Sequence, residues 1–274
     1  MPYLFKAKTT EGYTIKILAE LLQHNLKTAC FVIEPTGISL RQMDSHRHVL
    51  IDIHLSSDKF SIYKCKQVKR FMGINLNHLH KMLKSIKKKD SVILFIKEDS
   101  EDDLGIQVIP KEGNRVTTST IKIQNIQHLD IAVPEDYEKP VIVPSNEYQK
   151  MCKDMSNIGG EVSVFSKGFY IKFSCNQGAI YSREVLFGEI EDDDEEEEEE
   201  EDETPKVEYS EVFDTEQLHR IVKLSGLGET MQVYPKMELP LKFKSTIGQL
   251  GEISIYIKNK KQIEEEQLCS NDDE

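Results

Sequence analysis

Residues 144–160 read PSNEYQKMCKDMSNIGG and contain the clearest helical pattern in the chain. Apolar side chains recur there at intervals of three and four, at Tyr148, Met151, Cys152, Met155 and Ile158. This spacing places them on one face of an α-helix, and we expect that face to be buried. Ser145 follows Pro144 and is expected to cap the start of the helix. The stretch therefore predicts an amphipathic helix with one buried stripe.

Three other segments show the same spacing of apolar residues. They cover about 12–27, 76–85 and the residues from Asp214 to near Gly226. Asp214 opens the sequence Asp-Thr-Glu-Gln, which resembles a capping box at a helix start. The helices begin near residues 12, 76, 145 and 214, so the second pair repeats the first after 133 and 138 residues. This repeat indicates an internal duplication.

Runs of β-branched and aromatic residues fill the intervals between these helices and predict strands. We expect strands over 30–33, 49–55, 91–96, 117–123, 161–164, 170–175, 231–234 and 253–257. Helices and strands together predict an α+β fold of two similar domains, each with two helices packed on antiparallel sheets. The stretch DIAVPEDYEKP at 130–140 contains two prolines and lies between the copies, which is typical of a linker.

The predicted domain organisation follows from these boundaries. We expect an N-terminal domain over 1–127, an interdomain connector over 128–140 and a C-terminal domain over 141–258. Within the second domain we expect an acidic, disordered insertion over 190–205, and beyond it an acidic, flexible tail over 259–274.

Composition favours a globular protein with reduced thiols. The chain has 274 residues, of which 38% are hydrophobic, and its apolar runs are too short to span a membrane. The start, MPYLFKAKTTEG, lacks the apolar core of a signal peptide. The five cysteines are scattered, with no C-x-x-C pair. Such spacing is typical of reduced cysteines in the cytosol or nucleus.

The net charge of −13 comes from one segment, EDDDEEEEEEEDE at 191–203. Without these thirteen acids, 35 of the 48 acidic residues remain, against 35 basic residues. The rest of the chain is therefore close to neutral, and the net charge does not exclude nucleic acid as a partner. A run of like charges repels itself, so we expect a solvated loop there.

Basic residues recur on the polar faces of the predicted helices. Pairs three residues apart are Lys81 with Lys84, Lys150 with Lys153, and Arg220 with Lys223, and the first helix contributes Lys16, shortly after Lys8. Residues three apart share one helix face. Cations of this kind bind phosphate groups without reading bases, so the pattern indicates sequence-independent binding to nucleic acid.

Several long motifs resemble the proliferating cell nuclear antigen family, the eukaryotic and viral DNA sliding clamps. The most specific is residues 144–160, which follow the third-helix signature of that family. The supporting matches are TACFVIEPTGISLRQMDS at 28–45, FSIYKCKQVKRFMGINLNHLHKMLK at 60–84, VPEDY at 133–137 and ELPLKFKSTIGQLGEISIYI at 238–257. They occur in the order of the family and extend from near residue 4 to near 258.

The resemblance implies a non-enzymatic processivity factor for DNA polymerase that forms a homotrimeric ring of six similar clamp-type domains around duplex DNA. Its helices would line the hole, and the residues expected to bind DNA are Lys8, Lys16, Lys81, Lys84, Lys150, Lys153, Arg220 and Lys223. The chain departs from the family at Asn157, where histidine is usual, and at Glu216, where a basic residue is common, and Arg220 has no basic counterpart there.

The resemblance also implies a pocket near the connector that binds partner peptides with a glutamine and aromatic anchors. The matching residues are Met43, His48, Ile131, Val133, Pro134, Tyr137, Pro240 and Tyr256. His48 replaces an aliphatic residue, and the connector is one residue shorter before Pro144. Expected partners are DNA polymerase, the clamp loader and other replication and repair proteins with such motifs.

Subunit contacts are expected along two edge strands, 115–123 and 179–187, that match the intersubunit strands of the family. The interface residues are Thr117, Ser119, Ile121, Ile123, Tyr181, Arg183 and Val185. A charge at Ile121, or proline within 181–186, is therefore expected to give monomers. No cofactor, metal or membrane is implied, and the expected location is the nucleus or a site of viral DNA replication.

Two other classes of function remain open from the residues alone. Cys152 suggests a thiol hydrolase, and the pairs His46 with His48 and His78 with His80 suggest a metal-dependent one, although neither pair has a third ligand nearby in the sequence. A subunit of a heterotrimeric checkpoint-type clamp would carry the same basic helices. Lys167 lies one place from a lysine that is modified in the family, and we expect it as a modification site.

Overall fold

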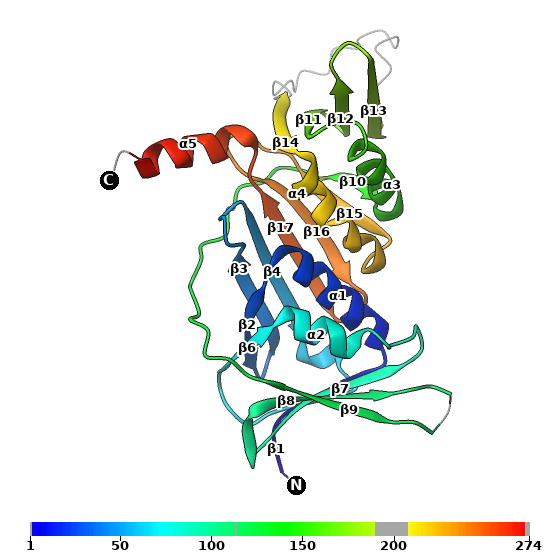
Figure 1. Cartoon of the computed structure of the whole chain (residues 1–274), viewed down its shortest axis with the longest axis vertical. Coiled ribbons are helices and arrows are strands. Elements are labelled where there is room, and N and C mark those ends of the chain that lie inside the picture. The colour runs from blue at the N-terminus through cyan, green and yellow to red at the C-terminus, as the bar shows by residue number, and fades with distance from the viewer. Residues whose placement is uncertain (1, 113, 190–207, 272–274) are drawn as a thin grey trace, which may run out of the picture. The chain divides into compact units, whose positions relative to one another are not determined.

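The computed structural model describes residues 2–112, 114–189 and 208–271 (Figure 1). The predicted acidic insertion over 190–205 lies outside these residues. The chain divides into two compact units. Unit 1 comprises Met1–Val133, Lys223–Glu229 and Lys244–Ile255, and unit 2 comprises Pro134–Val222, Thr230–Phe243 and Tyr256–Glu274.

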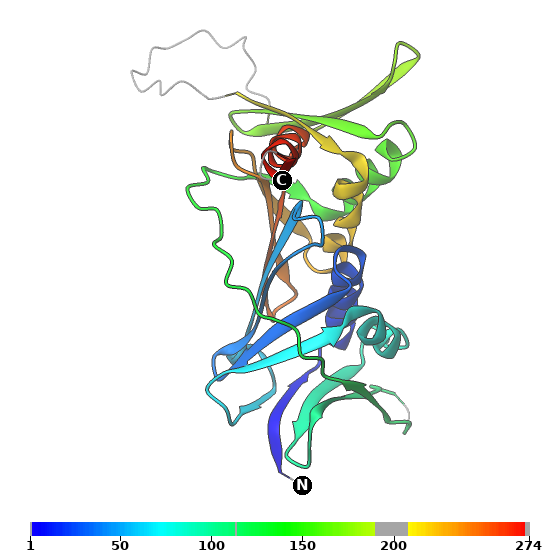
Figure 2. The same cartoon turned by 60° about the vertical axis from the view of Figure 1, so that its left-hand side comes forward.

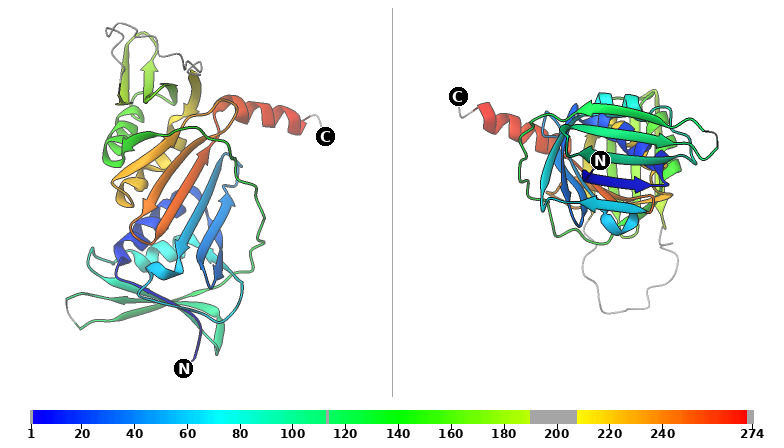
Figure 3. Two further views of the ribbon diagram at one scale, coloured as in Figure 1. Left: turned by 180° about the vertical axis from the view of Figure 1, so that it is seen from behind. Right: turned by 90° about the horizontal axis from the view of Figure 1, so that it is seen from below.

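Unit 1 contains antiparallel sheets and two α-helices. One sheet has five strands in the order β5-β1-β7-β8-β9, seen from below in Figure 3, and a second run of paired strands has the order β4-β3-β2-β6. The strands are β1 (Tyr3–Thr9), β2 (Thr28–Glu34), β3 (Gly37–Met43), β4 (Val49–Ser56), β5 (Ile62–Cys65), β6 (Arg70–Asn75), β7 (Ser91–Lys97), β8 (Ser100–Ile109) and β9 (Thr117–Lys122). The helices are α1 (Gly12–Asn25), α2 (Leu76–Leu83) and the short 3-10 helix η1 (Ser57–Lys59).

The core of unit 1 lies between its helices and its sheets, and Figure 2 shows α1 and α2 together on one side of the strands. The predicted stripes of both helices are buried: Ile15, Leu18 and Leu22 in α1, and Leu76, Leu79 and Leu83 in α2. A small apolar cavity of about 50 Å³ is lined by residues of α1, α2, β2, β3, β4, β6, β7 and β8. One continuous core therefore fixes the polar faces of α1 and α2 on the side away from it.

Unit 2 contains a four-stranded antiparallel sheet in the order β13-β12-β11-β14 and a pair of strands, β10 with β15. The strands are β10 (Val141–Pro144), β11 (Glu161–Lys167), β12 (Tyr170–Gln177), β13 (Tyr181–Gly188), β14 (Tyr209–Asp214) and β15 (Thr230–Tyr234). The helices are α3 (Ser145–Met155), α4 (Thr215–Arg220) and α5 (Lys260–Asn271). Three elements contribute residues to both units: η2 (Val222–Gly226), β16 (Leu241–Ile247) and β17 (Gly251–Ile257).

Tyr148 forms the centre of the unit 2 core. Its side chain is 0% exposed, and its ring lies 6.1 Å from that of Phe173 and 5.5 Å from that of Phe243. Its hydroxyl donates a hydrogen bond to the Leu218 carbonyl at 3.2 Å, which ties α3 to α4. The predicted stripe is buried at Tyr148, Met151, Cys152 and Met155, whereas Ile158 lies beyond the end of α3 and is half-buried. Tyr148 thus anchors both α3 and α4.

Three local expectations differ from the structure. Pro144 occupies the cap position of α3, and Ser145 is the first helical residue with a buried hydroxyl, because the end of strand β10 leads directly into the helix. Asp214 does cap α4, accepting from the Glu216 N–H at 2.7 Å, but the α-helix ends at Arg220 and a 3-10 helix continues to Gly226. In place of a flexible tail from residue 259, helix α5 begins at Lys260.

The structure also contains strands that the sequence did not reveal. Examples are β8, which begins with the acidic residues of SEDDLGIQVI, and the short β5. In both, pairing with neighbouring strands supplies the backbone hydrogen bonds, so an alternating apolar pattern is not required.

Candidate functional site

The lysines at the end of α2 are exposed, and their charges are not paired with carboxylates of the described residues. Lys81 lies in this helix and Lys84 is its C-cap residue; both are exposed, and neither forms an ion pair with any residue that the structure describes. Lys8 is half-buried in β1. Lys16 has a structural contact, since its ammonium donates to the Ile86 carbonyl at 3.1 Å and lies 5.4 Å from the centre of the Tyr13 ring. The predicted DNA residues of unit 1 therefore differ in how available their charges are.

Lys223 is already paired within unit 1. Its ammonium lies 2.8 Å from a carboxylate oxygen of Glu20 on α1. Burial is the largest single influence on the pKa of Glu20 and raises it, but the hydrogen bond and charge of Lys223, with smaller effects of the nearby His80 and His24, bring that pKa below its ordinary value. Lys223 therefore contributes less free charge than its position on the sequence suggests.

Unit 2 likewise combines paired and free cations. Lys150 lies 2.8 Å from Glu147 on the same helix, and Arg220 lies 2.6 Å from Glu216 on α4. Lys153 is exposed and has no ion-pair partner among the described residues. The Asn157 amide donates to the Lys153 carbonyl at 2.9 Å and completes the end of α3.

Just before the connector the chain pairs with unit 1, and the connector itself continues as an extended segment (Figure 2). Gln124 pairs with Gly73 in β6, and a side chain at Gly73 would bring its Cβ to 2.2 Å from the Gln124 carbonyl oxygen. Further along, the Ile131 carbonyl accepts from Arg41 at 3.3 Å, and Arg41 itself pairs with both oxygens of Asp52 at 3.2 Å. Arg41 was not among the predicted site residues, yet its hydrogen bond holds Ile131, one of the residues expected to line the peptide pocket.

The second part of the connector leads to a cluster of aromatic rings in unit 2. The Tyr137 hydroxyl donates to the Pro240 carbonyl at 2.8 Å, and the Tyr137 ring lies 6.0 Å from Tyr234 and 6.1 Å from Tyr256. The ammonium of Lys242 lies 5.0, 4.8 and 5.5 Å from the ring centres of Tyr137, Tyr234 and Tyr256. At such distances each ring attracts the cation. Lys242 was missed because nothing in its local sequence shows that three tyrosines surround it.

The eight residues predicted for the peptide pocket divide between the units. Met43, His48, Ile131 and Val133 belong to unit 1, whereas Pro134, Tyr137, Pro240 and Tyr256 belong to unit 2. His48 follows a tight turn in which its N–H donates to the Asp44 carboxylate at 2.8 Å. Tyr256 is 4% exposed, so most of its ring surface is committed to packing.

Both strands predicted for subunit contacts lie at sheet edges. β9 ends the five-stranded sheet and β13 ends the four-stranded sheet. Residues Thr117, Ser119, Ile121, Tyr181, Arg183 and Val185 lie on these two strands, and Ile123 directly follows β9. The side chain of Ile121 is buried in unit 1, so a charge there would disrupt the core, and the substitution does not test assembly alone. Arg183 forms an ion pair with Asp154 of α3.

The residues that suggested an enzyme lie in unsuitable surroundings. Cys152 is buried, and burial raises the pKa of its thiol to about 12, so the reactive thiolate is scarce near neutral pH. The rings of His46 and His48 lie 5.8 Å apart. Within residues 2–112, 114–189 and 208–271, no group of three or more His, Cys, Asp or Glu side chains is arranged to hold a metal ion.

No helix in the same ranges is long and apolar enough to cross a membrane. Lys167 is exposed, 3.2 Å from Glu208.

Comparison with known proteins gives matches over nearly the whole chain. The family model described as "Proliferating cell nuclear antigen, N-terminal domain" matches residues 4–131. The model described as "Proliferating cell nuclear antigen, C-terminal domain" matches residues 132–261. The chain is 26% identical over 258 residues to the "Probable DNA polymerase sliding clamp 1" of Paramecium bursaria Chlorella virus 1, covering 93% of this chain and 96% of that protein.

A solved structure has the same fold. The proliferating cellular nuclear antigen from Entamoeba histolytica superposes with a TM-score of 0.80 at 20% sequence identity, covering 94% of this chain and 100% of that chain. At this identity the match concerns the fold, which is an α+β fold with two similar domains.

Proposed function

The chain belongs to the proliferating cell nuclear antigen family, and from this membership we infer that it is a DNA sliding clamp. The observation that carries this conclusion is the match of both family domains, end to end, over residues 4–131 and 132–261. A sliding clamp encircles duplex DNA, makes the polymerase processive and recruits replication and repair proteins. It does so by topology and docking, so we propose that the chain catalyses no reaction.

We propose that the DNA contacts are made by basic residues on the helices of both units. Support comes from the exposure of Lys81, Lys84 and Lys153, whose charges are available to phosphate groups. Lys150, Arg220 and Lys223 would first have to leave their carboxylate partners, so we assign them weaker contacts.

We propose a homotrimer closed by pairing of β9 with β13 of a neighbouring subunit. Each strand lies at a sheet edge, and an unpaired edge readily accepts another strand. Exposed apolar side chains on β13 support the assignment: Tyr181 is 47% exposed and Leu186 is 37% exposed. A head-to-tail contact between two different edges closes into a ring when the rotation allows it.

We propose that partner peptides with a glutamine and aromatic anchors bind beside the connector. Two residues there are held by hydrogen bonds, which supports the proposal: the Ile131 carbonyl accepts from Arg41, and the Tyr137 hydroxyl donates to the Pro240 carbonyl. Replacing both with alanine should abolish peptide binding in calorimetry while sedimentation still gives a trimer. DNA polymerase and the clamp loader are the expected partners, and the nucleus or a site of viral DNA replication is the expected location.

Mass and DNA retention test the proposed function together. The purified chain should sediment as three copies of 31.6 kDa and, once loaded, remain on circular DNA but leave linearised DNA. The double variant Tyr181→Glu/Leu186→Glu should sediment as a monomer. Val68→Glu, which changes an exposed apolar residue that belongs to neither β9 nor β13, should stay trimeric. A wild-type chain that remains monomeric until different subunits are added would instead indicate a heterotrimeric clamp.

A further inference from the structure

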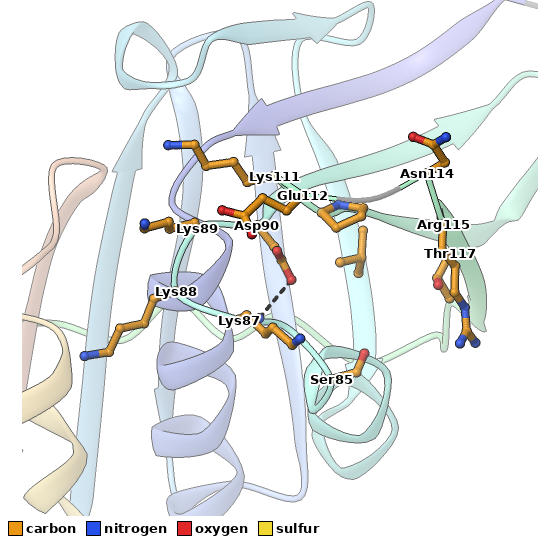
Figure 4. A pocket seen from close by; sticks show the side chains of 12 residues that line it. Ser85, Lys87, Lys88, Lys89, Asp90, Lys111, Glu112, Asn114, Arg115 and Thr117 are labelled. Atoms are coloured by element: carbon orange, nitrogen blue, oxygen red, sulfur yellow. Dashed lines mark hydrogen bonds between the residues drawn. The ribbon is translucent and has the colours of Figure 1, made fainter.

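A hollow of about 690 Å³ opens in unit 1 where the turn after α2 faces the loop between β8 and β9 (Figure 4). One wall comes from residues 85–90 and the other from residues within 108–112 and 114–117. The residues that line it include Lys87, Lys88, Lys89, Lys111 and Arg115, and we call it the basic hollow. None of these five belongs to the basic helix faces described above.

The charge of the basic hollow is not neutralised by its surroundings. All five cations are exposed, and none forms an ion pair with a described residue. Two carboxylates also line it, Asp90 and Glu112, which leaves a net charge of about +3 from five cations and two acids. Asp90 is buried, and its carboxylate accepts from the Lys87 N–H at 2.9 Å, so it stabilises the turn over residues 87–90.

The turn that carries three of the lysines has a fixed shape. Besides the Asp90 side-chain contact, the Asp90 N–H donates to the Lys87 carbonyl at 3.1 Å, and the Gly12 N–H of α1 donates to the Asp90 carbonyl at 3.2 Å. Lys16 donates to the neighbouring Ile86 carbonyl at 3.1 Å. Because the backbone is already ordered, a ligand bound here would order side chains only, which lowers the entropic cost of binding.

We propose that the basic hollow binds the phosphodiester backbone of DNA and extends the contact surface beyond the helices. The proposal rests on the clamp function, and it concerns residues outside the helix faces assigned to DNA. Lys81 on α2 and its C-cap residue Lys84 are followed closely in the chain by Lys87, Lys88 and Lys89, so a DNA strand that contacts the end of α2 would meet the hollow next.

The arrangement of the cations favours an extended polyanion over a single small anion. In Figure 4 the ammonium groups of Lys88, Lys89 and Lys111 extend to one side of the Asp90 turn, whereas Lys87 and Arg115 lie toward the other. Cations spread in this way match phosphates repeated along a backbone. Ser85, Asn114 and Thr117 add uncharged donors that suit phosphate oxygens.

The test compares three double variants of the full chain, each lacking two exposed cations. The hollow variant is Lys89→Ala/Arg115→Ala, with one cation from each wall. The helix variant is Lys81→Ala/Lys84→Ala. The matched control is Lys64→Ala/Lys139→Ala, which removes two exposed lysines that belong neither to the basic hollow nor to the helix pair. Sedimentation and thermal unfolding establish that all three assemble and fold as the wild type does.

The measurement is the salt dependence of binding to a short duplex DNA. Each lost phosphate contact lowers the log-log slope by about 0.9, so we expect the hollow variant to lose up to about 1.8 and the control nothing. Lys89 should also become protected from acetylation when DNA is bound, as read by mass spectrometry. If the hollow variant keeps the wild-type slope while the helix variant loses slope, the proposal is wrong and the clamp function stands. If neither loses slope, the assigned DNA face fails as well.

A second arm distinguishes nucleic acid from an acidic peptide. Binding of polyglutamate and of inorganic phosphate is measured with the same three variants. We expect polyglutamate to bind the wild type more weakly than DNA at equal charge. Loss of polyglutamate binding in the hollow variant, together with an unchanged DNA slope, would assign the hollow to acidic protein segments and overturn the proposal.

Discussion

Helices α2 and α3 carry the same pair of lysines three residues apart, yet they offer different amounts of free charge. Lys81 of α2 and Lys84, the C-cap residue of that helix, have no carboxylate within the helix, whose sequence is LNHLHKML. In α3, SNEYQKMCKDM, Glu147 lies one turn before Lys150 and pairs with it at 2.8 Å. A basic residue on a helix therefore indicates a phosphate contact only when no acidic residue one turn away pairs with it.

The buried faces of the two helices differ as well. α2 packs through the leucines of its stripe, whereas α3 packs through Tyr148, whose ring and hydroxyl are both used. The duplication thus keeps the position of the helix but changes how it is anchored. Four predictions test this contrast, beginning with the largest expected effect.

Tyr148→Ala should lower the free energy of unfolding by about 3–5 kcal/mol, because it removes a fully buried ring and leaves a cavity. Tyr148→Phe should cost only about 0.5–1.5 kcal/mol, since it removes one hydrogen bond and keeps the packing. Urea unfolding measures both. Equal losses in the two variants would mean that the hydroxyl, and not the ring, anchors α3.

Lys81→Ala/Lys84→Ala should flatten the log-log salt dependence of DNA binding by about 1.8, since both charges are free. Lys150→Ala/Lys153→Ala should flatten it by about 0.9, because only Lys153 is unpaired. Fluorescence titration of labelled duplex at several salt concentrations gives both slopes. An identical loss in the two variants would remove the contrast between the helices.

Glu147→Gln should release Lys150 and steepen the same slope by at most about 0.9. The side chain keeps its size, so the stability of α3 should change little. Glu135→Gln, at an exposed site on the connector, removes the same charge elsewhere and serves as the control. A steepening in both variants would reflect net charge and not the freed lysine.

Deleting Glu191–Glu203, which lie outside the described residues, should have the smallest effect. Charges separated from DNA by more than about 8–10 Å are screened at physiological salt. We expect a slope within about 0.9 of the wild-type value and an affinity that is equal or modestly higher. A clear loss of DNA binding by the deletion variant, checked as a trimer, would contradict this reading.

The sequence by itself determined the features that depend on short-range spacing. The stripe of Tyr148, Met151 and Met155, the four helix positions and their repeat all follow from the period of the α-helix, which is set locally. The family followed from motifs that are themselves continuous stretches. These features required no knowledge of how distant segments meet.

Tertiary structure decided which side chains are available for function. Lys16 donates to a carbonyl 70 residues away, Lys223 pairs with Glu20 on the first helix, and the side chain of Ile121 faces the core of unit 1 although its strand lies at an edge. Lys242 and the basic hollow became visible only when separate strands and loops were brought together. The physical reason is that a long charged side chain takes its partner from whichever segments folding places within a few ångströms, and spacing along the chain carries no record of that.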